Sequence, residues 1–239
     1  MCYTAAMIRI TALLLSLVFL NACGVSPSGQ EGPRILAMGD SMMAWNSLAG
    51  QSIPDAVAKD LGAPVVDRSV SGARMIYRLP ISGAAGLSIP KQFRGEAWDW
   101  VILNGGGNDL LFGCGCVACD RKMDKLIAED ASSGAFPDLV AKLRKSGARV
   151  VILGYLRSPG RNSPIENCRD EGDALDARLA KLAEGDAGVS FVPAAGLVPF
   201  GDLSFHALDR IHPSPKASQI IGGLVAEVIR KATYKASEQ

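Results

Sequence analysis

Four short segments of this 239-residue chain carry residues whose types suit chemistry. Ser41 ends a Gly-Asp-Ser tripeptide that follows an apolar run with no spacer. Gly72 comes next, Asn108 follows a run of three glycines, and Asp209 and His212 stand three residues apart near the C-terminus. Each segment alone is unspecific. Together they supply a hydroxyl, hydrogen-bond donors, an imidazole and a carboxylate, which is the set that acyl transfer requires.

Each group has a task in that reaction. The Ser41 hydroxyl becomes a nucleophile when a base within hydrogen-bond reach takes its proton, and a histidine such as His212 suits that role. Asp209 can accept a hydrogen bond from the other ring nitrogen and so fix the tautomer. The oxyanion of the tetrahedral intermediate needs preset donors, which the backbone N–H groups of Ser41 and Gly72 and the side-chain amide of Asn108 can supply.

Each residue also has a structural interpretation. Ser41 can cap a helix, Gly72 can occupy a turn that needs positive φ, and Asn108 can cap its loop. The glycines before Asn108 suggest a phosphate cradle, but the run lacks the Lys-Ser/Thr pair of a P-loop and the spacing of a dinucleotide-binding fingerprint. The convergence of the four segments favours catalysis over these interpretations.

The chain holds only two histidines, so His212 has one rival as the base. His206 follows Phe205 in an apolar stretch, a setting typical of a structural or pocket-lining histidine. Asp40 and Asp109 stand next to the candidate nucleophile and amide. We expect both carboxylates to bond nearby backbone rather than to exchange protons.

Five apolar, β-branched runs alternate with helical patterns along the chain. The runs cover residues 34–38, 64–70, 98–104, 148–156 and 189–194. Their continuous apolar character predicts strands buried on both faces, as in a parallel sheet. The helical patterns cover residues 53–61, 122–146, 173–183 and 215–231, with Ser214 as N-cap and Pro215 at the first position of the last.

This alternation predicts an α/β fold, a three-layer α/β/α sandwich around a five-stranded parallel sheet of flavodoxin-like order. In such folds ligands bind at the carboxyl ends of the strands. Ser41, Gly72 and Asn108 follow the first, second and third predicted strands, and the Asp209–His212 pair follows the fifth. The fold would therefore bring all of them to one edge of the sheet.

These segments resemble the conserved blocks of the SGNH (GDSL-like) hydrolase family, named for its catalytic Ser, Gly, Asn and His. The matching residues are Gly39-Asp40-Ser41, Gly72, Gly106-x-Asn108-Asp109 and Asp209-x-x-His212. The likeness runs from about residue 34 to residue 230. Met42 and Arg210 depart from the residues common in the family, but neither departure removes a catalytic group. The resemblance implies a three-layer fold and serine hydrolysis of esters or thioesters, without metal or cofactor.

Two hypotheses about function follow. The first is a cell-envelope esterase that hydrolyses an acyl ester (a carbohydrate O-acetyl group, a lipid or a small ester) through an acyl-enzyme on Ser41. The alternative is a non-catalytic envelope lipoprotein that uses the fold for binding or assembly. The first is favoured, because a binding module has no need of an intact nucleophile, base, carboxylate and amide together.

Charge gives a further indication about partners. The chain has 25 basic and 24 acidic residues, a balance that predicts no general attraction to nucleic acid. Four arginines follow predicted strands, and they either bind an anionic group of the substrate or form a solvated surface, the favoured interpretation. They are Arg74, Arg78, Arg157 and Arg161.

The first 22 residues have the pattern of an export signal. Arg9 precedes an apolar stretch of 11 residues at 10–20, too short to span a bilayer comfortably. Leu20-Asn21-Ala22-Cys23 resembles a bacterial lipobox, which predicts cleavage before Cys23 and its lipidation. The alternative is an ordinary secretory signal in which Cys23 is incidental.

The expected organisation is a signal peptide at 1–22, a tether at 23–33, a hydrolase domain at 34–233 and a tail at 234–239. A lipidated Cys23 would anchor the domain to a membrane facing the periplasm. With Gly24 rather than Asp after the cysteine, the outer membrane is the expected destination.

Four further cysteines form an even set, Cys114, Cys116, Cys119 and Cys168. Their spacing allows a zinc site, but an exported chain favours two disulfides. A bond between Cys114 and Cys116 would close a very tight ring, so two pairings stay open. Cys168 bonds either Cys114, with Cys116 bonding Cys119, or Cys116, with Cys114 bonding Cys119. The first is preferred. Either one ties the loop after Asn108 to the loop after the fourth strand.

Overall fold

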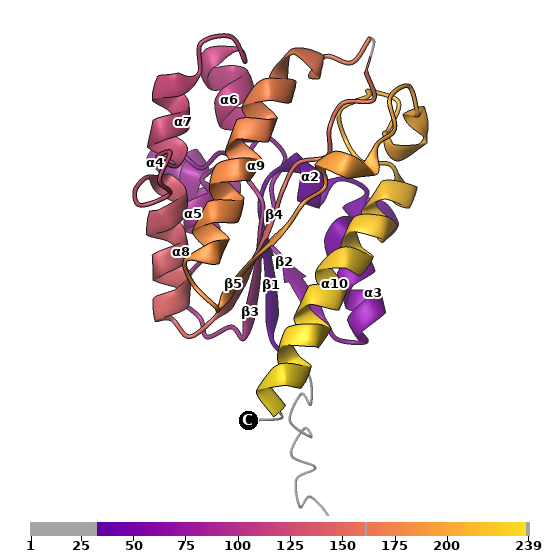
Figure 1. Ribbon diagram of the computed structural model, residues 1–239. Coiled ribbons are helices and arrows are strands. Elements are labelled where there is room, and N and C mark those ends of the chain that lie inside the picture. The colour runs from indigo at the N-terminus through magenta and orange to yellow at the C-terminus, as the bar shows by residue number, and fades with distance from the viewer. Residues whose placement is uncertain (1–32, 161, 238–239) are drawn as a thin grey trace, which may run out of the picture. The chain divides into compact units, whose positions relative to one another are not determined.

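Five parallel strands form the sheet at the centre of the fold (Figure 1). They are β1 (Ile35–Met38), β2 (Val65–Asp67), β3 (Trp100–Leu103), β4 (Arg149–Leu153) and β5 (Val189–Val192), in the order β2-β1-β3-β4-β5. This order confirms the predicted flavodoxin-like sheet. The computed structural model describes residues 33–160 and 162–237. The predicted signal peptide, Cys23, nearly all of the tether, and Arg161 therefore lie outside the described residues.

Alternate residues of the central strands face opposite sides of the sheet and enter two separate cores. Leu36 and Met38 of β1 belong to one core, and Ile35 and Ala37 belong to the other. This is the burial on both faces that continuous apolar runs predict. The edge strand β2 differs, because Val66 and its neighbour Asp67 are exposed. The prediction of two buried faces is therefore wrong for β2.

Helices cover both faces of the sheet. On one face lie α2 (Ser41–Ala44), α3 (Ile53–Leu61) and α10 (Pro215–Ser237). On the other lie α5 (Ile89–Gln92), α6 (Gly107–Cys114), α7 (Asp120–Leu126), α8 (Ala135–Lys145) and α9 (Arg169–Glu184). Shorter turns are η2 (Ser47–Ala49), α4 (Pro80–Ser82), η3 (Gly83–Leu87), η4 (Glu166–Cys168), η5 (Ala195–Leu197) and η6 (Leu203–Phe205). The three-layer sandwich is thus confirmed.

Two helices begin at the predicted positions, and a serine caps each of them. In α3, the Ser52 hydroxyl accepts a hydrogen bond from the Asp55 N–H (3.2 Å), and the Asp55 carboxylate accepts from the Ser52 N–H (2.9 Å), which forms a capping box. Ser214 caps α10, because its hydroxyl accepts from the Ala217 N–H (3.2 Å). The predictions of helices starting at residues 53 and 215 are correct, although α10 runs on to Ser237.

The predicted helix at 122–146 is wrong, because α7 and α8 are separate there. The Ala128 N–H donates to the Ser133 carbonyl (2.9 Å) and closes a turn in which Ala131 has φ +62°. Gly134 has φ +118°, and a Cβ there would lie 2.8 Å from the Leu126 carbonyl oxygen. Only glycine fits this close approach, so the helix is interrupted before α8. Similarly, α9 starts at Arg169, four residues before its predicted start.

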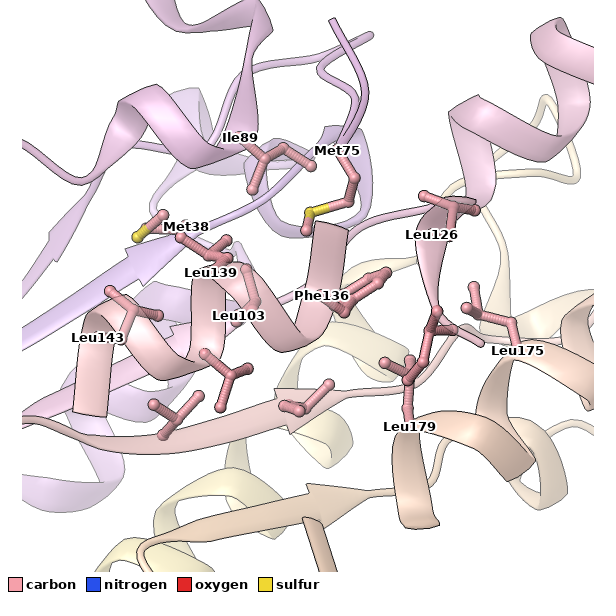
Figure 2. Close-up of a cluster of buried hydrophobic side chains, with 14 of the residues drawn as sticks. Met38, Met75, Ile89, Leu103, Leu126, Phe136, Leu139, Leu143, Leu175 and Leu179 are labelled. Carbon is pink, nitrogen blue, oxygen red and sulfur yellow. The ribbon is translucent and has the colours of Figure 1, made fainter. Parts of the chain in front are cut away.

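The larger core lies between the sheet and helices α8 and α9 (Figure 2). Phe136, Leu139 and Leu143 of α8 repeat at helical spacing and are buried over Met38 and Leu103. Phe136 has no exposed surface, so Phe136→Ala should cost about 3–5 kcal/mol of stability. This packing fixes the strands whose carboxyl ends carry the site.

The described chain enters and leaves the fold at the same edge of the sheet. β1 starts at the amino edge, two residues after Pro33, and α10 returns to that edge (Figure 1). The Arg149 side chain at the start of β4 donates to the Ala232 carbonyl near the end of α10 (3.4 Å). Within residues 33–160 and 162–237, no helix is both long and apolar enough to cross a membrane.

Candidate active site

A cavity of about 100 Å³ lies at the carboxyl edge of the sheet, as predicted for a ligand site in this fold. Ser41 at the start of α2, Asn108 after β3 and His212 before α10 all line it. Three of the predicted site residues, far apart in the sequence, thus share one cavity. The volume is several times the roughly 10–15 Å³ that a single water requires.

The turn that carries Ser41 is short, and hydrogen bonds hold the residues before and after it. Asp40 caps α2, and its Oδ1 accepts a hydrogen bond from the Met42 N–H (3.0 Å). The Gln92 side chain bonds both the N–H of Gly39 (2.8 Å) and its carbonyl (2.9 Å). A Cβ on Gly39 would lie 3.1 Å from the Asn104 carbonyl oxygen, which explains the glycine. Ser41 is therefore the first helical residue on a fixed turn.

Tyr155 links this turn to α6. Its hydroxyl donates to Asp40 Oδ2 and accepts from the Gly107 N–H (2.9 Å). Burial raises the pKa of both Asp40 and Tyr155 above their ordinary values. Asp40 thus has the structural role expected of it. Sequence reasoning missed Tyr155, although its position two residues beyond β4 places it at the same edge of the sheet.

His212 is held by a carboxylate, as its spacing predicts. Its Nδ1 lies 2.6 Å from Asp209 Oδ2, and Asp209 Oδ1 accepts from the N–H groups of Ile211 (3.0 Å) and His212 (3.1 Å). Burial acts to raise the pKa of Asp209, but the hydrogen bonds from His212 and the backbone outweigh it and hold that pKa below its ordinary value. The bonded Nδ1 leaves Nε2 as the nitrogen that can act as a base.

His206 has a different setting from His212. It is buried, neither ring nitrogen has a hydrogen-bond partner among the described residues, and it does not line the cavity. Burial lowers the pKa of His206, although the Arg157 backbone and the nearby Asp209 and Asp202 act in the opposite direction. The geometry therefore favours His212 as the base.

Asn108 sits in the first turn of α6, and its Nδ2 donates one hydrogen bond to the Ala73 carbonyl (3.0 Å). An amide nitrogen carries two hydrogens, so the second remains for a ligand. Gly72 has φ +81° and does not itself line the cavity; it is connected to the site through its neighbour Ala73. The next residue, Asp109, accepts from the N–H groups of Met75 (2.8 Å) and Ile76 (2.9 Å), which is the structural role expected of it.

Six leucine and isoleucine side chains also line the cavity, and we call this set the cavity wall. It consists of Leu110, Leu111, Leu156, Ile165, Leu175 and Ile211. Two arginines also line the cavity, and both are paired within the protein. Arg157, only 6% exposed, bonds Asp173 (2.7 Å) and Asp176 (2.8 Å), while Arg169 bonds Glu166 (3.1 Å). Burial nevertheless raises the pKa of Asp176.

Of the four arginines singled out in the sequence, Arg157 is thus a buried structural residue rather than part of a solvated surface. The guanidinium of Arg74 lies over the exposed Phe112 ring (5.3 Å to the centroid), and Arg78 is exposed. Neither of these lines the cavity. The Glu166 partner of Arg169 also accepts from the Ser158 hydroxyl, which closes the loop at 158–169 on itself.

Two disulfides, Cys114–Cys119 and Cys116–Cys168, link the end of α6 to the start of α7 and the loop between them to η4. This is the second of the two open pairings, so the preferred one is wrong. The reason is local: α6 ends at Cys114, and Gly115 and Cys116 both have positive φ, which turns Cys116 inward. Cys114 is left beside the start of α7, where its Cα lies 5.3 Å from that of Cys119. Cys168 itself lines the cavity.

The described residues include no group of three or more His, Cys, Asp or Glu side chains placed to hold a metal ion. The three cysteines of the C-x-C-x-x-C segment and the distant Cys168 all form disulfides. The zinc site weighed for these cysteines is therefore replaced by covalent bridges.

Comparison with known proteins identifies the family. Residues 37–220 match the GDSL-like Lipase/Acylhydrolase family. The match covers well over half of the chain, which therefore belongs to this family and is a hydrolase of the SGNH/GDSL type that acts on ester bonds. The resemblance seen in the sequence is confirmed, and the non-catalytic alternative receives no support.

Solved structures share the fold at low sequence identity. A candidate SGNH hydrolase from Slackia heliotrinireducens has a TM-score of 0.59 at 22% identity, over 83% of this chain and 99% of that chain. TesA has a TM-score of 0.57 at 22% identity, with coverages of 83% and 99%. The psychrotrophic esterase EstA from Pseudoalteromonas sp. has a TM-score of 0.57 at 15% identity, with coverages of 84% and 98%. No curated protein matches the chain.

Proposed function

We propose that the protein is a serine esterase that forms an acyl-enzyme on Ser41. The Ser41 oxygen attacks the ester carbonyl carbon while His212 takes its proton, and the resulting oxyanion is held by the Ser41 and Gly72 N–H groups and the Asn108 amide. The intermediate collapses, the alcohol leaves with the proton from His212, and the acyl group stays on Ser41. Water, activated by His212, then releases the acid.

The observation that carries this proposal is that His212, bonded to Asp209 at 2.6 Å, lines the same cavity as Ser41 and Asn108. The carboxylate orients the ring and stabilises the imidazolium that forms during each proton transfer. Because the Asp209 pKa lies below its ordinary value, the group is ionised at neutral pH, as this role requires.

The lining also bears on the acyl group. The cavity wall offers apolar side chains, while Arg157 and Arg169 already bond carboxylates of the protein. Among the described lining residues a charged acyl group would find no unpaired arginine, and it would lose its hydration. We therefore propose an apolar acyl chain longer than acetyl as the group bound, whether the alcohol part is a glycan, a lipid or a small molecule.

Covalent labelling tests the nucleophile. The protein should react with a fluorophosphonate at a single site and hydrolyse p-nitrophenyl esters, and Ser41→Ala should lose both properties. Ser69→Ala, in the loop after β2, serves as the matched control and should retain them. The esterase EstA was solved in a form inhibited by monoethylphosphonate, so this class of reagent suits the test. Efficient labelling of the Ser41→Ala protein, seen by intact mass, would contradict the assignment.

An acyl-length series tests the substrate. Turnover of p-nitrophenyl esters should rise from acetate towards medium chains. Leu111→Trp puts a larger side chain into the cavity, so the preference should shift back towards acetate. Phe112→Trp, at the neighbouring exposed position, should not change the preference. A preference for acetate in the wild type, unchanged by Leu111→Trp, would contradict an acyl chain in this cavity.

We further propose that Cys23 is lipidated and anchors the domain to a membrane facing the periplasm, with the outer membrane as the destination. The support is the lipobox-like Leu20-Asn21-Ala22-Cys23 after an apolar stretch, followed by Gly24. Expressed in a bacterial host, the full chain should partition into detergent, and Cys23→Ser should abolish this. Release of the wild-type protein as a detergent-independent periplasmic form would contradict the anchor.

A further inference from the structure

The indole ring of Trp45 lies flat against the imidazole of His212. The ring centroids are 3.8 Å apart and the planes differ by 7°. Trp45 directly follows α2, the helix that Ser41 opens, and its backbone N–H donates to the Ser41 carbonyl (2.9 Å). The nucleophile and the surface on which the imidazole rests therefore belong to one segment of five residues.

Asn46, the residue after Trp45, holds the backbone that follows His212. Asn46 has φ +66°, and its side-chain amide donates to the Pro213 carbonyl (3.0 Å) and lies 3.4 Å from the Ser218 hydroxyl. The main chain just after the imidazole is thus fixed to the residue just after the indole. These contacts join α2 to the start of α10 and set the position of the ring relative to Ser41.

A stacked indole does more than support a neutral imidazole. Its face carries the negative part of the ring quadrupole, so a positively charged imidazolium gains a cation–π attraction that the neutral ring lacks. The charged form arises when His212 takes the Ser41 proton. An interaction that strengthens in the transition state accelerates the reaction, whereas uniform binding does not.

Other charges also face the imidazole. The Asp209 carboxylate bonds Nδ1, and Asp40, the N-cap of α2, interacts with His212 through space. Arg157 and Arg169 line the same cavity but are paired with carboxylates. All four groups stay in place when Trp45 is replaced, so a comparison of Trp45 variants isolates the contribution of the indole.

We propose that Trp45 is a positioning residue that holds His212 beside Ser41 and favours its cationic form. The part of the proposal that concerns rate rests on the proposed esterase function. The part that concerns the ring does not, because the protonation of His212 is measurable without a substrate.

The test combines an NMR titration of the two histidines with pH–rate profiles on a p-nitrophenyl ester. Trp45→Leu keeps an apolar side chain against the ring but removes the quadrupole, so the His212 titration midpoint and the acid limb of kcat should both move to lower pH. The value of kcat should fall by about 3- to 30-fold, with KM little changed. Trp45→Phe should retain part of both effects, because phenyl offers a weaker face.

Trp98→Leu is the matched control, because Trp98 also packs against a cation, Arg68 (5.6 Å), but lies away from the cavity. It should leave the His212 titration unchanged. Identical His212 midpoints in wild type and both Trp45 variants would overturn the proposal. If the midpoint shifts as expected but the wild type hydrolyses no ester, the role of the stack stands and the proposed esterase function fails.

Discussion

The turns that carry the chemistry and the wall that shapes the cavity are built in different ways. The site turns, at residues 39–41, 105–109 and 209–212, are short, and hydrogen bonds to the backbone fix each of them, some local and some from distant residues. The cavity wall instead draws on α6, α9 and the loops at 156–165 and 211, which disulfides and buried ion pairs hold together. Hydrogen bonds thus position the reacting groups, whereas disulfides and ion pairs position the side chains that shape the cavity.

This difference means that the two regions should respond differently to change. A substitution in a site turn should slow all esters alike, since it acts at the carbonyl group that every ester shares. A change in the cavity wall should alter the preference among acyl groups and the stability, and should leave hydrolysis of the smallest ester largely intact.

The largest effect is expected at Asp209. Asp209→Asn should fold normally, yet kcat should fall by an order approaching 10⁴, because the amide cannot stabilise the imidazolium or fix the tautomer in the same way. Steady-state kinetics on two esters of different acyl length measure this, with circular dichroism to verify folding. Near-normal turnover would show that another group orients His212 and that Asp209 has no part in the reaction.

Asn108→Ala should come next, with a loss of about 10²–10³ in kcat, because it removes one oxyanion donor and leaves the nucleophile and base in place. Fluorophosphonate labelling should persist, and the loss should be the same for short and long acyl chains. Asn167→Ala, exposed on η4, is the control and should retain full turnover. A loss confined to one acyl length would place Asn108 in the cavity wall instead.

The two disulfides should differ in stability and in effect on fit. Loop entropy predicts a loss of about 4 kcal/mol on removing Cys116–Cys168, which spans 52 residues, and about 2 kcal/mol on removing Cys114–Cys119, which spans 5. Paired Cys→Ala variants and their melting temperatures measure this difference. Only the first should alter the acyl-length preference, because Cys168 lines the cavity. Four free thiols in non-reducing peptide mapping of the wild type would contradict both disulfide assignments.

The smallest expected effect concerns pH and the loop after β2. Burial raises the pKa of Asp109 to about 6, although the Met75 and Ile76 N–H groups act to lower it. A carboxyl whose pKa is raised on folding contributes stability that is complete below its unfolded value, near 4, and is lost as pH rises through 6. The melting temperature should therefore fall across that range, and less so in Asp109→Asn. Asp138→Asn, exposed on α8, should keep the wild-type slope, and equal slopes in all three proteins would contradict the assignment.

The sequence predicted the site turns better than the cavity wall, and the reason is physical. Buried parallel strands leave long apolar runs, and the residues that follow them meet at one edge by topology alone, which is why Ser41, Asn108 and His212 could be grouped. The wall depends on pairs such as Cys116–Cys168 and Arg157–Asp176, where each partner has several chemically equivalent alternatives nearby. The Trp45 stack likewise depends on the approach of two segments that no local pattern records.

The edge at which the chain enters and leaves the fold has a practical consequence. Pro33 leads into β1 at the amino edge of the sheet and α10 returns to that edge (Figure 1). The cavity instead lies at the carboxyl edge, where Ser41, Asn108 and His212 line it. A random coil as long as the predicted 11-residue tether would have a root-mean-square reach of about 17–20 Å. An attachment made just before Pro33 or just after α10, whether a lipid, a fusion partner or a resin, therefore joins the domain at the edge of the sheet opposite the cavity. Immobilised protein should keep the turnover of free protein, which makes surface display a convenient format for substrate screening.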